Sequence, residues 1–267
     1  MFSLLAFLQL SAPVLADDDD EAGVKVTVLV SEGLLIQSAD AVVLIDAFID
    51  PRRSKSDSEL IAVQRDMLAG EPPFSSIQLA LVSHPHHDHF HAPTAGAFLK
   101  SHPETILASS PEVIEAIRIE YIGYPSVKDQ LKKIKTKKGK LSSFSHADIG
   151  VKLIPFSHEA SALYPEQVLG HIIYLAGRKL LYIGDAEMRF ENWEPFDLKS
   201  LEIDAALAPF WLFREPITRK IIKEQVAPRK TIVVQIPPKG LKDKLTELSK
   251  ELPEVIFLSE AMASIEL

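Results

Sequence analysis

The chain has no cysteine among its 267 residues. Disulfide bridges, thiolate zinc sites and cysteine nucleophiles are therefore all excluded. Any bound metal ion must be held by histidine, aspartate, glutamate or an amide oxygen. With 46% hydrophobic and 25% charged residues, the chain can still bury a substantial core and is not disordered.

The sequence also lacks a hydrophobic run of the roughly 20 residues that a bilayer-spanning helix needs. Residues 1–16 carry no charged side chain and end in a small residue, Ala16, just before an acidic run. This pattern predicts a signal peptide at 1–16, an acidic linker at 17–23 and one folded domain at 24–267. We therefore expect a periplasmic or secreted protein without a stable membrane anchor. Because the start of the chain lacks Lys and Arg, a cytoplasmic protein with an apolar tail is the alternative.

An excess of positive charge is absent as well. The formal net charge is −8, and the acidic residues at 17–21 carry five of these charges, so the remaining body stands at about −3. No basic nucleic-acid motif is present, and we expect no nucleic-acid partner. The expected partner is a small-molecule substrate, and the sequence leaves the oligomeric state open.

A dense cluster of histidines stands out instead. Residues 84–89 read His-Pro-His-His-Asp-His directly after the apolar run 77–83. Residues i and i+2 of an extended chain point the same way, so His84 and His86 can bind one ion together. Asp88 and His89 follow where the strand has ended and can turn toward a neighbouring position. Since imidazole and carboxylate are common ligands of zinc and similar metals, the segment predicts two adjacent metal sites.

A chance histidine-rich surface loop is the alternative explanation of this run. Against it, four further predicted strands also end in polar residues: Asp46, His158, Asp185 and Gln235. Each of these alone has an ordinary structural explanation, such as a turn cap. Polar residues that directly follow buried strands are, however, where α/β proteins place their active sites. Taken together, the residues favour one functional site at a sheet edge.

The order of predicted elements indicates the architecture. Strands come in two batches, each with helices following, which suggests two β-rich halves packed together with helices outside in one α/β domain. Strands are predicted at 24–30, 33–38, 41–46, 77–83, 105–109, 151–155, 169–175, 179–183, 205–208, 230–235 and 255–258, and helices at 58–68, 93–101, 111–121, 216–225 and 241–252.

These motifs resemble the metallo-β-lactamase-fold hydrolase superfamily over roughly residues 24–260. Segments such as 44–48, 81–84 and 209–211 are most similar to its broad bacterial metallo-hydrolase branch, close to the ascorbate-phosphate lactonase-like proteins. The resemblance implies a four-layer αββα sandwich with a metal site in the cleft at the strand ends.

The resemblance also implies roles for individual residues. The first metal ion would be held by His84, His86 and His158, and the second by Asp88 and His89. Asp185 would bridge the two ions. Asp46 would orient the histidine loop through hydrogen bonds without binding metal.

The fifth motif departs from the family pattern. The family usually has a histidine where this chain has Gln235, and a register that puts Lys239 there is the alternative. An amide oxygen is a weak neutral ligand for zinc, and a Lys ammonium would repel a cation. We therefore expect a second site that is weaker, better suited to an oxygen-preferring metal, or empty. The expected cofactor is a divalent metal, zinc first, bound as one or two ions.

The predicted activity is metal-dependent hydrolysis. A bound ion lowers the pKa of water from ~15.7 toward ~7, and Asp88 is the predicted catalytic residue that orients the water and shuttles a proton. By family analogy the substrate is a lactone, another ester or a phosphoester, with β-lactams ranked lower. The alternative is a non-catalytic or degenerate member of the fold that binds a ligand and has an impaired second metal site.

Overall fold

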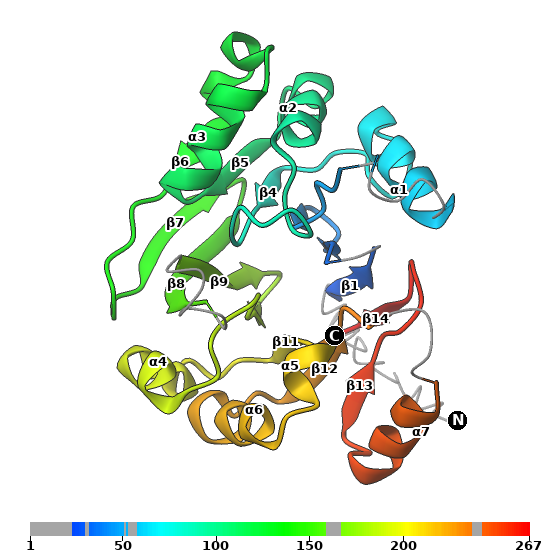
Figure 1. Cartoon of the computed structure of the whole chain (residues 1–267), viewed down its shortest axis with the longest axis vertical. Helices are drawn as coiled ribbons and strands as arrows, with labels where there is room; N and C mark the ends of the chain where they lie inside the picture. Colours follow the sequence, from blue (N-terminus) through cyan, green and yellow to red (C-terminus); the bar gives the residue numbers. More distant parts are fainter. Residues whose placement is uncertain (1–22, 30–31, 51, 53–57, 159–166, 237–241) are drawn as a thin grey trace, which may run out of the picture.

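The computed structural model describes residues 23–29, 32–50, 52, 58–158, 167–236 and 242–267 (Figure 1). The predicted signal peptide at 1–16, nearly all of the acidic linker at 17–23, and Lys239 lie outside these residues, so the predictions made for them stay predictions. Within the described ranges, no helix is both long enough and apolar enough to cross a membrane.

The first sheet combines an antiparallel half with a parallel half. Its strand order in space is β14 (Ser264–Glu266), β1 (Lys25–Val28), β2 (Leu34–Gln37), β3 (Val42–Ile45), β4 (Leu79–Leu81), β5 (Ile106–Ser109) and β6 (Leu131–Lys133). Neighbours from β14 to β3 pair antiparallel, and neighbours from β3 to β6 pair parallel. The connections of the parallel half carry the helices α1 (Ser58–Ala69), α2 (Ala92–Ser101) and α3 (Pro111–Glu120).

The second sheet repeats this plan. Its strand order is β13 (Val255–Phe257), β12 (Lys230–Val234), β11 (Ala205–Pro209), β10 (Arg178–Tyr182), β9 (Gln167–Leu175), β8 (Ile149–Ser157) and β7 (Ser142–His146). Strands β7 to β10 pair antiparallel and β10 to β13 parallel. Its helices are α4 (Phe190–Trp193), α5 (Phe210–Phe213), α6 (Pro216–Ile221), which continues as a π-helix over Ile222–Val226, and α7 (Lys242–Glu251).

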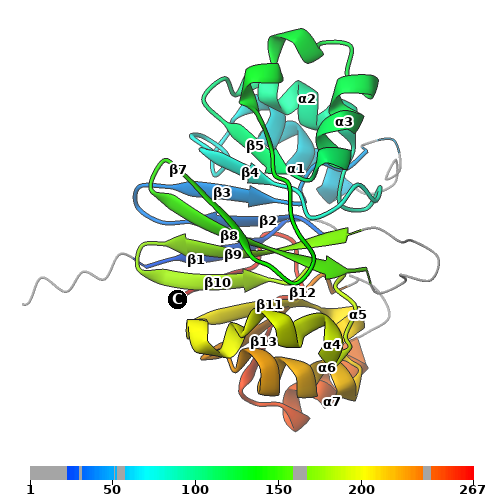
Figure 2. The ribbon, with the colours of Figure 1, turned by 90° about the vertical axis from the view of Figure 1, so that its left-hand side faces the viewer.

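The two sheets face each other and the helices form the outer layers. Figure 2 shows α1, α2 and α3 on one side of the sheets and α4, α6 and α7 on the other. One apolar core lies between the sheets and includes Leu81 and Tyr182. A second core lies under the helices of the first sheet, and a third lies under those of the second sheet. The predicted αββα sandwich is confirmed.

Local sequence explains most of the elements. Helix α3 begins with Pro111 at its first position, and the Ser110 side chain caps it by accepting a hydrogen bond from the Val113 amide. The helix predicted at 216–225 is present, but its last turn is π-helical. Strands β6, β7 and β14 and the one-turn helices α4 and α5 are absent from the sequence-based prediction. These three strands consist of exposed and half-buried residues and lack the apolar run that marks the central strands.

The parallel pairing brings the ends of several strands to one edge of the sandwich. In the first sheet Ile45 pairs with Leu81, and the Asp46 amide donates to the Leu81 carbonyl at 3.1 Å. The segments that follow β3 and β4 therefore begin next to each other. In the second sheet His158 after β8 forms a bridge with Ala186 after β10. The polar residues that the sequence places at strand ends therefore meet in space.

Candidate metal centre

Three histidines from both sheets face one another at this edge. His84 and His86 follow β4, and His158 follows β8. The ring centroids of His84 and His86 are 4.5 Å apart, those of His86 and His158 are 4.6 Å apart, and those of His84 and His158 are 5.0 Å apart. One ring nitrogen from each lies within 4.8 Å of the others, which is the spacing of ligands around a single ion.

A second cluster shares His84 and adds His89 and Asp185. The two oxygens of Asp185 face different partners. Oδ2 lies 3.9 Å from His84 Nε2 and 3.8 Å from His158 Nε2, whereas Oδ1 lies 3.3 Å from His89 Nε2. Asp185 therefore belongs to the second cluster and also approaches His158 of the first, as a carboxylate that bridged two ions would.

Asp46 holds the histidine loop from behind. Its Oδ1 accepts the Ser83 amide at 2.7 Å, and its Oδ2 accepts the Ser83 hydroxyl at 2.6 Å, His89 Nδ1 at 2.9 Å and the Tyr182 hydroxyl at 2.8 Å. Complete burial alone would raise the pKa of Asp46, but the hydrogen bonds from His89 and Ser83 outweigh it and hold that pKa below its ordinary value. Asp46 therefore acts as a carboxylate that orients the loop, in the role the resemblance implies.

The hydrogen bonds of Ser83 fix the tautomer of His84. The Ser83 hydroxyl donates its proton to Asp46, so at 2.9 Å from His84 Nδ1 its oxygen can only accept. His84 is therefore protonated on Nδ1 and presents the lone pair of Nε2 to the cluster. Burial and the neighbouring His89, His86 and His158 keep the pKa of His84 far below its ordinary value. A neutral imidazole is the form that binds metal.

His89 is held between two carboxylates. Asp46 lies at Nδ1 and Asp185 at Nε2. Burial opposes a charge on this ring, but the two carboxylates prevail and raise the pKa of His89 well above its ordinary value. Asp46 orients the ring so that Nε2 points toward Asp185.

Gly184 is required for the approach of Asp185. Its φ is +54°, in the left-handed region that favours glycine. A Cβ at this position would lie 2.9 Å from Val168 Cγ1 and 3.4 Å from Ser83 Cβ. The chain can therefore pass directly against the histidine loop only because residue 184 has no side chain.

Gln235 follows β12 and is buried, with a φ of +58°. Its Nε2 donates to the Tyr182 hydroxyl at 3.0 Å, and that hydroxyl in turn donates to Asp46. Gln235 Oε1 is buried with no hydrogen-bond partner in the described part of the chain. The amide nitrogen therefore supports Asp46, and the weak-ligand role predicted for Gln235 rests on the oxygen alone.

Asp88 lies in the turn that the His89 amide closes by donating to the His86 carbonyl at 3.0 Å, and its side chain is half-buried. Among the described residues it joins neither cluster. Its predicted roles as ligand and proton shuttle therefore stay predictions. His87 in the same turn is exposed. His91 Nδ1 is 2.7 Å from the Thr94 hydroxyl oxygen, outside both clusters.

Three residues of the centre are not singled out by the sequence: Ser83, Tyr182 and Glu32. Ser83 and Tyr182 could be suspected from their places at the ends of the strands that lead to His84 and Asp185. Glu32 stands in the turn between β1 and β2, next to Gly33. Burial raises the pKa of the Glu32 carboxyl to about 8, a change that Asp185, Asp88 and Asp46 reinforce and His89 opposes.

His171 on β9 is a packed histidine inside the sandwich. It is fully buried, its ring stacks parallel to Tyr182 at 6.2 Å between centroids, and neither ring nitrogen has a hydrogen-bond partner among the described residues. Burial lowers the pKa of His171 to about 4, although Asp46 opposes the shift. The ring is therefore neutral in the folded protein at neutral pH.

Acid should destabilise the fold through His171. The unfolded chain takes up a proton near pH 6.5 and the folded chain only near pH 4, so stability falls as the pH drops through this interval. Between pH 7 and pH 4 we expect the free energy of unfolding to fall by about 3 kcal/mol less in His171→Leu than in wild type. Urea unfolding of metal-free protein at pH 7 and pH 4 measures it, and a difference between variant and wild type that is equal at both pH values would contradict it.

The donor set fits a divalent metal ion. His84 presents an oriented, neutral and buried Nε2 that has no hydrogen-bond partner in the described ranges. Two imidazoles and one carboxylate oxygen converge in the second cluster. Buried polar atoms that face each other without partners are costly unless a ligand satisfies them. These residues can therefore hold a metal ion.

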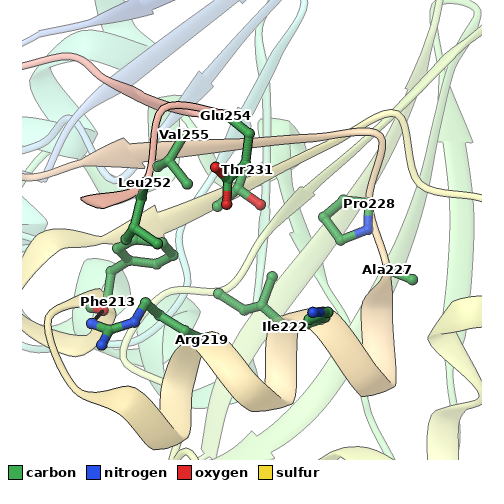
Figure 3. A pocket seen from close by; sticks show the side chains of 10 residues that line it. Phe213, Arg219, Ile222, Ala227, Pro228, Thr231, Leu252, Glu254 and Val255 are labelled. Atoms are coloured by element: carbon green, nitrogen blue, oxygen red, sulfur yellow. Dashed lines mark hydrogen bonds between the residues drawn. The ribbon is translucent and has the colours of Figure 1, made fainter. Parts of the chain in front are cut away.

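A separate cavity of about 590 Å³ lies among α5, α6, β12 and β13 (Figure 3). Phe213, Leu252 and Arg219 are among the residues that line it. Thr231 near the start of β12 also lines it, whereas Gln235 at the metal centre follows the end of that strand. Four residues of extended chain span about 13 Å, so this cavity does not adjoin the metal centre.

A histidine and aspartate cluster at the strand ends of an αββα sandwich defines a metallo-β-lactamase-fold protein with a centre that can hold metal. The family model for the beta-lactamase superfamily domain matches residues 42–216, and the chain belongs to that family. The predicted superfamily is confirmed. A comparison with curated proteins finds no match.

Solved structures share the fold at low sequence identity. The metallo-beta-lactamase fold protein YhfI from Bacillus subtilis has a TM-score of 0.62 and 14% identity, covering 92% of this chain and 100% of that one. A possible metal-dependent hydrolase from Veillonella parvula gives 0.64 and 16%, with coverage of 92% and 100%. Zn²⁺-bound PqqB from Methylobacterium extorquens gives 0.55 and 14%, with coverage of 88% and 87%.

Proposed function

We propose that this protein is a metal-dependent hydrolase that acts on an ester, lactone or phosphoester bond of a small molecule. The observation that carries the proposal is the pair of clusters built on His84, in which a carboxylate, Asp185, stands between two groups of imidazoles. A divalent ion held there acts as a Lewis acid and lowers the pKa of water. No serine or cysteine nucleophile is needed.

Different side chains are proposed to bind the metal ions, to orient the ligands and to transfer a proton. His84, His86 and His158 would hold the first ion, and His89 with Asp185 the second. Asp46 and Ser83 keep the rings of His89 and His84 in the orientation and tautomer that ligands need. We assign to Asp88, half-buried in the adjoining turn, the acceptance and return of a proton during the reaction.

Zinc is the proposed metal for the first position. Three neutral imidazoles are a common zinc ligand set, and the structural neighbour PqqB is described as Zn²⁺-bound. The second position is proposed to be weaker, because Gln235 can offer only a neutral amide oxygen where the family usually has a histidine. A protein that binds metal but hydrolyses none of the three substrate classes would support the alternative of a non-catalytic ligand-binding member of the fold.

Metal removal tests the proposal. Dialysis against a chelator is expected to abolish hydrolysis of a panel that holds an aryl ester, a γ-lactone and an aryl phosphodiester, because the nucleophile depends on the metal. Added Zn²⁺ should restore at least one of these activities. The assay is steady-state turnover beside metal content by elemental analysis. Full turnover in a metal-free preparation would rule out the proposed chemistry.

A further inference from the structure

Glu32 lies beside the metal centre although it belongs to a distant part of the chain. The turn that carries it is closed by the Leu29 amide, which donates to the Gly33 carbonyl at 2.8 Å. A Cβ on Gly33 would lie 3.2 Å from Ala47 Cα, so the turn is pressed against the backbone that directly follows Asp46. The register of β2 and β3, in which Leu34 pairs with Ile45, leads to the same contact.

One carboxyl oxygen of Glu32 has no hydrogen-bond partner among the described residues. This oxygen, Oε2, is buried. The groups that act most strongly on this carboxyl are His89, Asp185, Asp88 and Asp46, with no Lys or Arg among these described neighbours. Glu32 therefore lies near three other carboxyl groups, of which Asp46 and Asp185 are buried. Such a grouping is costly unless a proton or a cation compensates the charge.

The neighbours of Glu32 are those of one particular metal position. His89 and Asp185, which we propose to hold the second ion, are both among the groups that act on the Glu32 carboxyl. This is also the position where Gln235 stands in place of the usual histidine and can offer only a neutral amide oxygen, a weak ligand. Carboxylate oxygens suit Mn²⁺ and Mg²⁺ better than a histidine-rich set does.

We propose that Glu32 supplies the anionic oxygen for the second metal ion that the fifth-motif residue does not supply, which makes this position selective for an oxygen-preferring cation such as Mn²⁺. Among the described residues Glu32 joins neither cluster. Its side chain has three rotatable bonds, and Oε2 has no hydrogen bond to break before it turns toward an ion. The inference rests on the proposed metal-dependent function and adds a residue and a metal preference to it.

Glu32→Gln tests the proposal, because it keeps the shape of the side chain and removes its charge. Metal-free protein is titrated with Zn²⁺ and then Mn²⁺ by calorimetry, with metal content measured after gel filtration. Wild type should bind one tight Zn²⁺ and one weaker Mn²⁺. In Glu32→Gln the Mn²⁺ step should weaken about 10- to 100-fold while the Zn²⁺ step is unchanged. Glu32→Asp, which keeps the charge, should recover part of the Mn²⁺ affinity.

Glu71→Gln is the matched control, since Glu71 is an exposed glutamate in another turn. It should leave both binding steps unchanged. The melting temperature of the metal-free protein should be the same for wild type and Glu32→Gln, which separates a metal role from a structural one. Equal Mn²⁺ binding in wild type and Glu32→Gln, or no Mn²⁺ step in wild type, would overturn the role of Glu32. No binding of either metal by wild type would instead overturn the proposed function itself.

Discussion

Replacing His86 with alanine is expected to release the metal ion from the three-histidine cluster and to lower hydrolytic activity about 1,000-fold or more. The reason is that His86 is one of only three imidazoles in that cluster, and even residues that merely orient ligands change metal affinity or activity by about 10- to 100-fold. His86 is half-buried, so the substitution should leave the fold intact. Elemental analysis and steady-state kinetics measure both effects.

His87→Ala is the matched control for this variant. His87 is the next residue in the same turn, it is exposed, and it belongs to neither cluster of described residues. Its replacement should preserve metal content and turnover. Retention of one full equivalent of Zn²⁺ by His86→Ala, or an equal loss in both variants, would contradict the assignment of the first metal position.

Asp46→Asn should be strongly destabilising although it changes only one atom. Asp46 accepts four hydrogen bonds, and an asparagine amide group would present a donor to Ser83, His89 or Tyr182, which are donors themselves. Disruption of such a buried charged group costs about 3–5 kcal/mol. We also expect metal affinity to fall about 10- to 100-fold, because the ring of His89 loses its anchor. Urea unfolding and zinc titration measure the two effects.

The control for Asp46→Asn is Asp40→Asn. Asp40 is an exposed residue in the turn between β2 and β3, only six positions away along the chain. It should change neither the free energy of unfolding nor zinc binding measurably. An Asp46→Asn protein as stable as wild type, with unchanged zinc affinity, would show that Asp46 does not hold the loop.

The sequence predicts the fold and the principal residues of the centre because both depend on local patterns. The spacing of His84 and His86 after an apolar run is visible within a few residues, and so is a polar residue at a strand end, such as Asp185. The alternation of strands and helices predicts the layers. Since parallel strands end at one edge of a sheet, these strand-end residues are expected to gather there, and they do.

The sequence does not predict side-chain interactions between residues that lie far apart along the chain. The hydroxyl of Tyr182 reaches Asp46 across 136 positions of the chain, and the Gln235 amide reaches Tyr182 across 53. Glu32 is a further case, because its proximity to the centre depends on the packing of the turn before β2 against Ala47. A charged residue in a turn is ordinarily solvated, so composition alone gives no reason to place Glu32 at a metal site.

The short polar strands β7 and β14 were unpredictable for a related reason. In β7, exposed and half-buried residues alternate over Ser142–His146, and its pairing with β8 is what defines it as a strand. In β14, Ile265 pairs with Val26 at the opposite end of the chain. Such edge strands form because a neighbour offers free backbone groups, and their own side chains contribute little signal.

A crystal of the protein grown with Zn²⁺, with anomalous diffraction recorded on both sides of the zinc absorption edge, is the most direct test of the metal centre. We expect a strong anomalous peak coordinated by His84, His86 and His158, with Asp185 directed toward it. A zinc ion bound elsewhere on the molecule, with these three rings uncoordinated, would contradict it.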